Sequence, residues 1–144
     1  MKRELTSART VIAGDASGEV LYGTTALSFW GGVDAHSGCV IDRRHNLCGC
    51  LITGKMLVLP RAAGSCSTSG ILLEMIRVGT MPAAVICVYA EPLLCMGSVI
   101  SEKLYGKWMP VYTVSEEEYA LLANAGQAKI RADRIVITEG EGEV

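Results

Sequence analysis

The residues best suited to chemistry lie together at positions 64–70, which read Gly-Ser-Cys-Ser-Thr-Ser-Gly. An apolar run at 55–60 predicts a buried strand before them, and apolar residues at helical spacing from Ile71 predict a helix after them. The start of a helix presents unpaired backbone N–H groups and a partial positive charge, so this segment suits a phosphate, a carboxylate or a developing oxyanion. The same residues also suit a structural role, in which Ser67 or Thr68 caps the helix.

The segment does not match the common phosphate-binding or nucleophile patterns. A Walker loop requires a lysine where this chain has Ile71, and a nucleophile elbow requires glycines two residues either side of its serine. The two histidines, His36 and His45, both lie in predicted polar turns, so the chain offers no complete Ser-His-Asp triad of its own. A pairing of Cys66 with His45 is the alternative for nucleophilic chemistry.

Six cysteines raise the question of disulfides or a metal site. The N-terminal residues show no apolar secretory segment, so we expect reduced thiols and a cytoplasmic protein. Cys87 and Cys95 lie in apolar runs and are expected to be buried as small hydrophobic side chains. Cys48 and Cys50 are separated by one residue rather than two, and together with His45 they leave a metal site as an alternative.

Composition and charge argue against several classes of protein. The 144 residues carry a net charge of −2 and only 6% aromatic residues, which provides neither a basic field nor stacking surfaces for nucleic acid. No apolar run reaches the roughly 18 residues of a membrane span. Residues 46–101 hold only five charged side chains, although 19% of the whole chain is charged. A middle this apolar is expected to be buried, or to form part of a surface that meets a partner.

The pattern of elements predicts a single mixed α/β domain over residues 1–144. The buried strand at 55–60, the following helix and a second buried strand at 83–88 predict a right-handed parallel crossover. Ser115 and Glu118 have the spacing of a capping box at the start of another helix. The remaining expectations are loops at 29–38 and 61–70, strands within 11–22 and at 39–42, 110–114, 128–130 and 134–138, a helical or irregular segment at 91–101, and a frayed acidic tail at 139–144.

Several segments, taken in order, form a pattern that is specific to one family. They are 29–34 (Phe-Trp-Gly-Gly-Val-Asp), 38–45 (Gly-Cys-Val-Ile-Asp-Arg-Arg-His), 54–60 (Gly-Lys-Met-Leu-Val-Leu-Pro), 64–69 and 79–84 (Gly-Thr-Met-Pro-Ala-Ala). In order and spacing they resemble the small subunit of aconitase X, over residues 14–114. The first two segments resemble the bacterial hydroxyproline-type members more closely than the archaeal phosphomevalonate-type members.

This resemblance implies the swivelling β/β/α domain that forms the mobile fourth domain of aconitases. In the family, this domain closes over a large subunit that carries most of the active site and the iron or iron–sulfur centre, so no metal is expected in this chain. The reaction is a dehydration, in which a base removes a proton from carbon and a neighbouring hydroxyl leaves as water. The family's catalytic serine follows the glycine of its Gly-Ser loop, which maps onto Ser65.

The resemblance therefore implies a hydro-lyase small subunit, inactive alone, that dehydrates a small hydroxy acid such as cis-3-hydroxy-L-proline with Ser65 as the base. The substrate-binding candidates are Gly64, Cys66, Ser67, Arg61, Asp34 and His45. Phosphomevalonate dehydration is one alternative, and a non-catalytic module that binds an anion or a protein is another. The isolated chain is also a candidate for self-association. This sequence departs from the family pattern at Ala35, Asn46 and Thr68, where proline, proline and glycine are usual.

Overall fold

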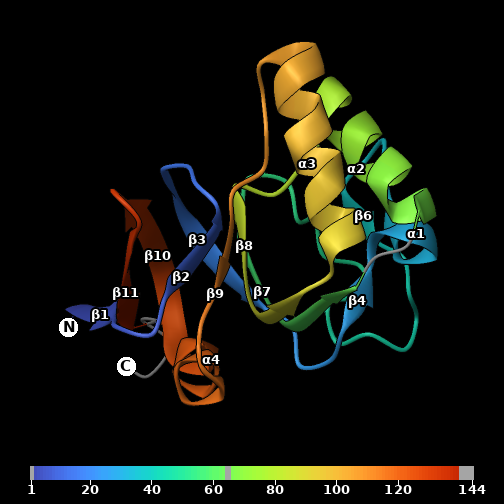
Figure 1. The fold of residues 1–144 in the computed structure, drawn as a ribbon. Coiled ribbons are helices and arrows are strands. Elements are labelled where there is room, and N and C mark those ends of the chain that lie inside the picture. The colour runs from blue at the N-terminus through green and yellow to red at the C-terminus, as the bar shows by residue number, and fades with distance from the viewer. Residues whose placement is uncertain (1, 64–65, 140–144) are drawn as a thin grey trace.

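The computed structural model describes residues 2–63 and 66–139. In chain order the elements are β1 (Lys2–Leu5), β2 (Arg9–Ile12), β3 (Ala16–Tyr22), β4 (Leu27–Ser28), α1 (Phe29–Gly32), β5 (Val33–Asp34), β6 (Cys39–Val40), β7 (Met56–Ala63), α2 (Cys66–Val78), β8 (Ala84–Ala90), α3 (Pro92–Tyr105), β9 (Val111–Thr113), α4 (Glu116–Leu121), the 3₁₀ turn η1 (Leu122–Asn124), β10 (Ala125–Arg131) and β11 (Arg134–Glu139). Figure 1 shows α2 and α3 together on one side of the strands, with β1, β10 and β11 on the other.

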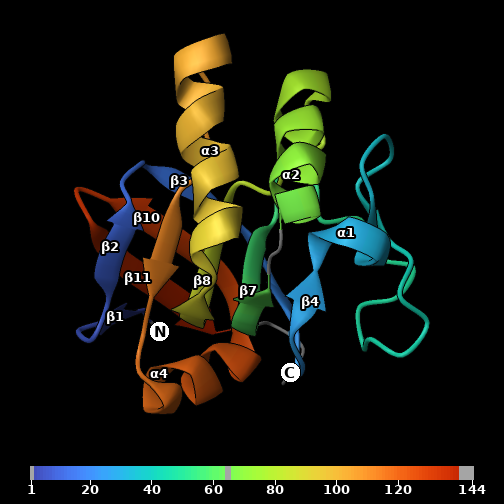
Figure 2. The ribbon, with the colours of Figure 1, turned by 45° about the vertical axis from the view of Figure 1, so that its right-hand side comes forward.

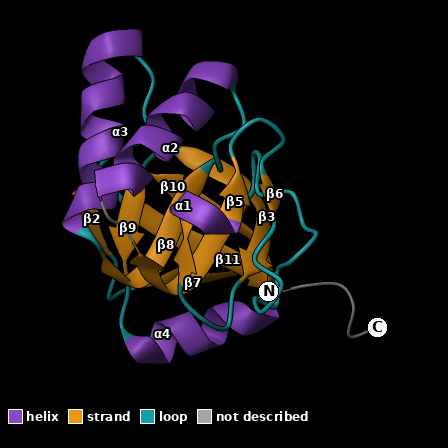
Figure 3. Cartoon of the chain, turned by 90° about the vertical axis from the view of Figure 1, so that its right-hand side faces the viewer, coloured by secondary structure: helices purple, strands orange, loops and turns teal. Residues whose placement is uncertain are grey.

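Strand β7 is central to the sheet, whose order is β1-β11-β10-β3-β7-β8-β9-β2. It pairs in parallel with β3 and β8, and β8 pairs in parallel with β9. Strand β10 is antiparallel to both β3 and β11, and β1 adds to the outer edge of β11. The parallel strands β7 and β8 lie between the two helices and the antiparallel β1-β11-β10 ribbon (Figure 1). Figure 3 shows α2 and α3 at one end of the strands and α4 at the other.

Alternate residues of β7 belong to two different hydrophobic cores, because successive side chains of a strand point to opposite faces. Leu57 and Leu59 are fully buried in a cluster with the apolar face of α2, including Leu72 and Met75. Met56, Val58 and Ile86 belong to the second cluster, which is completed by Ala128, Ile130, Ile135 and Ile137 of β10 and β11. A helical layer and two β layers result, which confirms the predicted α/β class and β/β/α architecture (Figure 2).

Most predicted elements are present with extended boundaries. The strands expected at 55–60 and 83–88 are β7 and β8, and they are parallel with α2 between them, as the crossover prediction requires. The segment at 91–101 is helical, since it forms most of α3. The closing strands are β10 and β11, which form an antiparallel hairpin. No described helix has the length and apolar character needed to cross a membrane.

Three expectations need correction. The predicted loop at 61–70 was too long, because β7 continues to Ala63, where Ala62 pairs with both β4 and β8, and α2 already begins at Cys66. The predicted loop at 29–38 contains the short α1 and β5, although α1 is irregular, with Gly31 at a φ of 79°. Strand β1 was not expected, because its pairing with β11 joins opposite ends of the chain and leaves little local signal.

Helix α4 begins with only half of the predicted capping box. The Ser115 hydroxyl accepts a hydrogen bond from the Glu118 backbone N–H at 3.2 Å, as predicted. The Glu118 carboxylate, however, accepts from the backbone N–H groups of Thr6 and Ser7, at 2.9 Å each, instead of returning to Ser115. The Ser115 N–H donates to the Ser7 hydroxyl at 2.9 Å. Ser115 and Glu118 therefore bond to the segment between β1 and β2, and these hydrogen bonds hold that segment against the start of α4.

Candidate active site

Two strand ends and two helix starts meet at one edge of the parallel strands. Strand β7 ends at Ala63 before α2 begins at Cys66, and β8 ends at Ala90 before α3 begins at Pro92. Because β7 and β8 are parallel, the N-termini of α2 and α3 lie at the same edge, with the two helices side by side (Figure 2). Backbone N–H groups and the positive ends of two helix dipoles converge there, where open α/β sheets commonly bind ligands.

Contacts between the first turns of the two helices hold their starts together. The Ser69 hydroxyl of α2 donates a hydrogen bond to the Leu93 carbonyl oxygen of α3. Gly97 lies so close to Ser69 that a Cβ atom at this glycine would be 3.0 Å from the Ser69 carbonyl oxygen. The absence of a side chain at Gly97 thus allows α2 and α3 to approach closely, and the Ser69 hydrogen bond stabilises this contact.

In the sequence, the predicted base and its neighbours lie between the end of β7 and the first turn of α2. Gly64 and Ser65 lie outside the described residues. Cys66 and Ser67 belong to the first turn of α2 by their backbone, and their side chains also lie outside the description. The elements on either side, β7 and α2, are those that the sequence predicts around the serine.

Thr68 is the first residue of α2 whose side chain is described, and it is fully buried. Its hydroxyl has no hydrogen-bond partner among the described residues. Buried hydroxyls are ordinarily hydrogen-bonded, and leaving one unpaired destabilises a protein. Glycine is usual at this position in the family, so Thr68 adds a buried hydroxyl for which the described residues offer no hydrogen-bond partner.

Arg61 lies on β7 close to the edge where the helices start. Its guanidinium forms an ion pair with Glu91, the residue that precedes α3, and lies over the Tyr89 ring, 5.1 Å from the ring centroid. The Glu91 backbone N–H also donates to the Ala62 carbonyl oxygen at 3.0 Å. Because the Arg61 side chain is 56% exposed and a guanidinium carries five N–H donors, it can bind a carboxylate from solvent while Glu91 and Tyr89 hold it in place.

Asp34 organises a turn between β5 and β6. Its carboxylate accepts hydrogen bonds from the Ser37 hydroxyl at 2.8 Å and from the His36 backbone N–H at 3.3 Å. These two bonds, the Ser37 bond foremost, hold the pKa of Asp34 below its usual value. In this arrangement Asp34 is an ionised carboxylate whose oxygens stabilise the turn.

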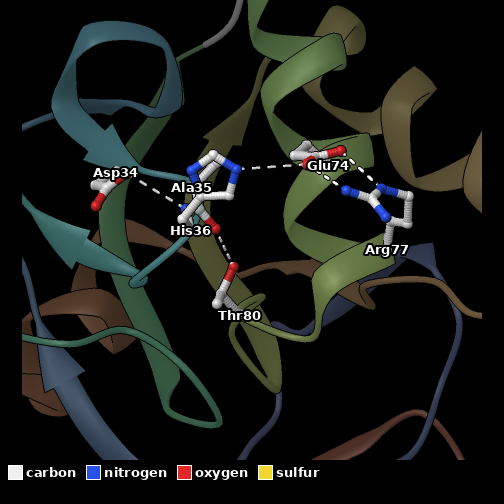
Figure 4. A network of polar contacts seen from close by, with 6 residues as sticks. All are labelled: Asp34, Ala35, His36, Glu74, Arg77 and Thr80. Carbon is white, nitrogen blue, oxygen red and sulfur yellow. Dashed lines mark hydrogen bonds and ion pairs between the residues drawn. The ribbon is translucent and has the colours of Figure 1, made fainter.

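The same turn is fastened to α2 and to the segment after it (Figure 4). The His36 Nε2 atom lies 3.6 Å from a carboxylate oxygen of Glu74 on α2. Glu74 is in turn bound by Arg77 through two hydrogen bonds of 2.9 and 2.6 Å, which lower the pKa of Glu74. The Thr80 hydroxyl donates to the Ala35 carbonyl oxygen. The contacts of Ala35 and His36 therefore hold the Asp34 turn against α2 and the residues that follow it.

His45 is buried, and both of its ring nitrogens are used within the protein. The Nδ1 atom accepts from the Leu47 backbone N–H at 3.1 Å, and Nε2 lies 2.9 Å from the Thr25 carbonyl oxygen. Nε2 must therefore carry the proton, which makes His45 a neutral imidazole that joins two turns. Asn46 strengthens this junction, because its side-chain oxygen accepts from the Thr24 backbone N–H at 2.9 Å. The departure at Asn46 thus has a structural role.

The described cysteines are free thiols, at residues 39, 48, 50, 87 and 95. Cys87 is fully buried as predicted, and burial raises the pKa of its thiol to about 12; burial also raises the pKa of the half-buried Cys95. Within residues 2–63 and 66–139, no three His, Cys, Asp or Glu side chains gather in a way that could hold a metal ion.

Sequence reasoning missed Glu91 and Tyr89 as partners of Arg61, and Ser69 as the link between the helices. Glu91 had one available signal, since it is the only acidic residue between positions 75 and 101. An isolated carboxylate in an apolar segment usually has a partner. Tyr89 and Ser69 offered no comparable signal, because both residue types are common at strand ends and helix starts.

Comparisons with known proteins identify the family of this fold. The model of the aconitase X swivel domain family matches residues 5–138. The chain is 45% identical over 108 residues to cis-3-hydroxy-L-proline dehydratase of Pseudomonas aeruginosa, covering 75% of this chain and 19% of that protein. The chain therefore spans about a fifth of the length of that relative.

Two further relatives match over most of their length. The phosphomevalonate dehydratase small subunit of Methanothermobacter thermautotrophicus is 38% identical over 125 residues, which cover 87% of this chain and 92% of that protein. The crystal structure of aconitase X from Thermococcus kodakaraensis, in its holo-form, superposes with a TM-score of 0.78 at 30% identity, over 95% of this chain and 99% of that chain. Fold and sequence agree, and the chain belongs to the aconitase X swivel domain family.

Proposed function

We propose that this chain is the small subunit of a hydro-lyase that dehydrates a small hydroxy acid, with cis-3-hydroxy-L-proline as the substrate. The observation that carries the proposal is the 45% identity to a cis-3-hydroxy-L-proline dehydratase, combined with two helix N-termini at the edge where β7 ends and α2 begins, the two elements that flank Ser65 in the sequence. That relative is about five times as long as the matched region, so the rest of the enzyme is proposed to come from a separate large subunit.

Ser65 is the proposed proton-abstracting base. A serine hydroxyl is a very weak acid, so its alkoxide requires strong stabilisation by hydrogen-bond donors and positive charge. The start of α2 supplies unpaired N–H groups and the positive end of a helix dipole, and Arg61 adds a cation nearby in the chain. These interactions strengthen when water is excluded, so we expect activity only after a large subunit covers the site.

Arg61 is proposed to bind the substrate carboxylate. Its exposed guanidinium forms a fork that suits a carboxylate, while the ion pair with Glu91 and the contact with Tyr89 limit its orientations. Gly64, Cys66, Ser67, Asp34 and His45 remain proposed contributors to the substrate pocket. For the last two, the hydrogen bonds of the described structure favour a role in positioning the loops around the site.

The iron or iron–sulfur centre is proposed to lie in the large subunit. This placement is supported by the described His, Cys, Asp and Glu residues, no three of which form a cluster that could hold a metal ion. His45 illustrates the point, since both of its ring nitrogens already have partners. The chain's own contribution is therefore the base, substrate contacts and exclusion of water.

The test is co-expression with a large subunit and an assay of cis-3-hydroxy-L-proline dehydration. We expect turnover by the complex and none by either subunit alone. Ser65→Ala is expected to lower turnover by about 10²–10⁴-fold, as expected for loss of a general base. Thr24→Ala, which removes an exposed hydroxyl, is the matched control and should leave turnover unchanged. Full activity of a correctly assembled Ser65→Ala complex would overturn the assignment of the base.

Phosphomevalonate is the second candidate substrate. It is favoured by the match to a separate small subunit of similar length, which this chain covers to 92%. Turnover of the two substrates by the same assembled complex separates the candidates. Binding of small anions without turnover of either substrate, even with a large subunit present, would instead favour a non-catalytic module.

A further inference from the structure

A basic cavity opens on the face of the molecule opposite to α2 and α3. It has a volume of about 700 Å³ and lies on the outer side of the layer formed by β1, β11, β10 and β3. Cationic residues Lys2, Lys129, Arg131 and Arg134 line it, and Val136 contributes to its apolar floor. Its described lining contains no acidic residue, although the chain as a whole is slightly acidic. A volume of this size is typical of small-molecule sites.

These four cations have no counterion within the described part of the chain. None of them appears in an ion pair; the pairs that form involve Lys55, Arg61, Arg77 and His36 instead. The two acidic residues that hold the hairpin turn have other partners. Asp15 accepts from the Ala132 backbone N–H at 3.2 Å, and Asp133 accepts from the Tyr112 hydroxyl at 2.7 Å.

The fold places two of these cations in direct opposition. Arg131 and Arg134 are paired residues at the end of the β10–β11 hairpin, and like charges at such positions destabilise a sheet. The two residues between them, Ala132 and Asp133, both adopt positive φ angles, of 52° and 63°. This conformation is unfavourable for alanine, and the hydrogen bonds through Asp15 and Tyr112 hold the turn in place. An anion between the arginines would relieve their repulsion.

The remaining lining residues extend the site along the strands. Lys129 lies on the same face two residues before Arg131 and is paired with Val136, so it adds a cation beside the two arginines, toward the middle of the cavity. Lys2 pairs with Thr138 at the other end, four residues along β11 from Arg134, which corresponds to about 13 Å. Val136 lies between the two ends. A ligand matching this pattern is elongated, with a strongly anionic group at one end and an apolar body.

We propose that this cavity binds an organic phosphate. The phosphate lies among Arg131, Arg134 and Lys129, which provide the forked donors and point charge that phosphates bind best, and the body extends over Val136 toward Lys2. Both β layers separate this site from the start of α2. The proposal is therefore independent of the dehydration reaction and of its substrate.

The test is calorimetric titration of the full 144-residue chain at physiological ionic strength, with ADP, adenosine and inorganic pyrophosphate as probes. We expect ADP to bind more tightly than adenosine, which lacks the phosphates, and more tightly than pyrophosphate, which lacks the body. Replacing both arginines, by Arg131→Gln and Arg134→Gln, should weaken ADP binding about tenfold or more. Arg44→Gln with Lys103→Gln, at two exposed residues that do not line this cavity, removes the same charge and should leave ADP binding unchanged.

A thermal melt keeps the test independent of folding defects. Removing the opposed arginines relieves repulsion, so the doubly substituted chain is expected to melt at the wild-type temperature or above it. ADP should raise the melting temperature of the wild type but not of this variant. Equal binding of ADP and adenosine, or equal weakening by the two pairs of substitutions, would overturn the proposal. Equal binding of pyrophosphate and ADP would remove the role assigned to Val136.

Discussion

Replacing Glu118 by glutamine tests the junction that ties the N-terminal strands to α4. The carboxylate accepts the backbone N–H groups of Thr6 and Ser7, together with the Ser7 hydroxyl. A glutamine side chain keeps one acceptor oxygen and replaces the other by an NH₂ donor, so one backbone N–H loses its partner. Hydrogen bonds to charged groups contribute about 1.5–3 kcal/mol each, and this junction is only partly buried. We therefore expect Glu118→Gln to lower the free energy of unfolding by about 2 kcal/mol.

Urea denaturation measures this loss. With a denaturant dependence of about 2 kcal/mol per molar urea, the midpoint should fall by about 1 M. Glu117→Gln is the matched control. Glu117 is exposed in the same first turn of α4, and its substitution removes the same charge from the start of the helix. Its effect is expected within about 0.5 kcal/mol. Equal midpoint shifts for the two variants would refute the reasoning, since only the general charge of the helix start would then matter.

The pH dependence of the same difference gives a second check. Burial by itself raises the pKa of Glu118, but the hydrogen bonds from Ser7 and Thr6 outweigh it, and the pKa lies below the ordinary value of 4.5. The folded protein therefore binds this proton less readily than the unfolded chain, so the carboxylate contributes stability above pH 4.5 that is lost as the pH falls through the folded pKa. The gap between wild type and Glu118→Gln should be constant near neutral pH and shrink in acid. A gap that widens in acid would contradict this assignment.

Three further outcomes follow from the structure. Thr68→Val should raise the free energy of unfolding by about 1 kcal/mol in urea denaturation, because it removes a buried hydroxyl without a described partner at nearly constant volume; a loss of stability would show that the hydroxyl is bonded. Cys87 should resist iodoacetamide in the folded chain at mildly alkaline pH while the exposed Cys48 reacts, as followed by peptide mass spectrometry, and labelling of both at equal rates would contradict the burial. Arg61→Ala should raise the KM of the proposed dehydratase complex about tenfold or more with a smaller change in kcat, and an unchanged KM would exclude Arg61 from carboxylate binding.

Much of the fold was predictable because its signals are local. The apolar run that became β7 lies between a glycine and a proline, and the helical spacing after it belongs to α2. The parallel crossover followed from the order of these elements, and the Ser115 cap from a spacing of three residues. The ordered motifs predicted the aconitase X swivel family, which the family match and the superposed structure confirm.

The boundaries of the candidate site were less predictable because local preferences compete there. Small hydroxyl residues suit a loop and a first helical turn almost equally, so the run at 61–70 could be divided in several ways. Strand pairing sets the boundary between β7 and the residues that follow it. Ala62 pairs with Leu27 of β4 and with Ala90 of β8, which keeps the chain in the sheet up to Ala63. Strand β1 was hidden for the same reason, because its partner β11 lies at the far end of the chain.

By itself, the sequence predicted the family, the order of most elements and a serine-rich segment at the junction of β7 and α2. Only the tertiary structure decided which charges neutralise one another. Arg61 meets Glu91 from 30 residues away, whereas Arg131 and Arg134 are brought side by side and left without a described counterion. Electrostatic energy depends on distances in space, and those distances are set by strand register and by the packing of layers, which no local spacing along the chain encodes.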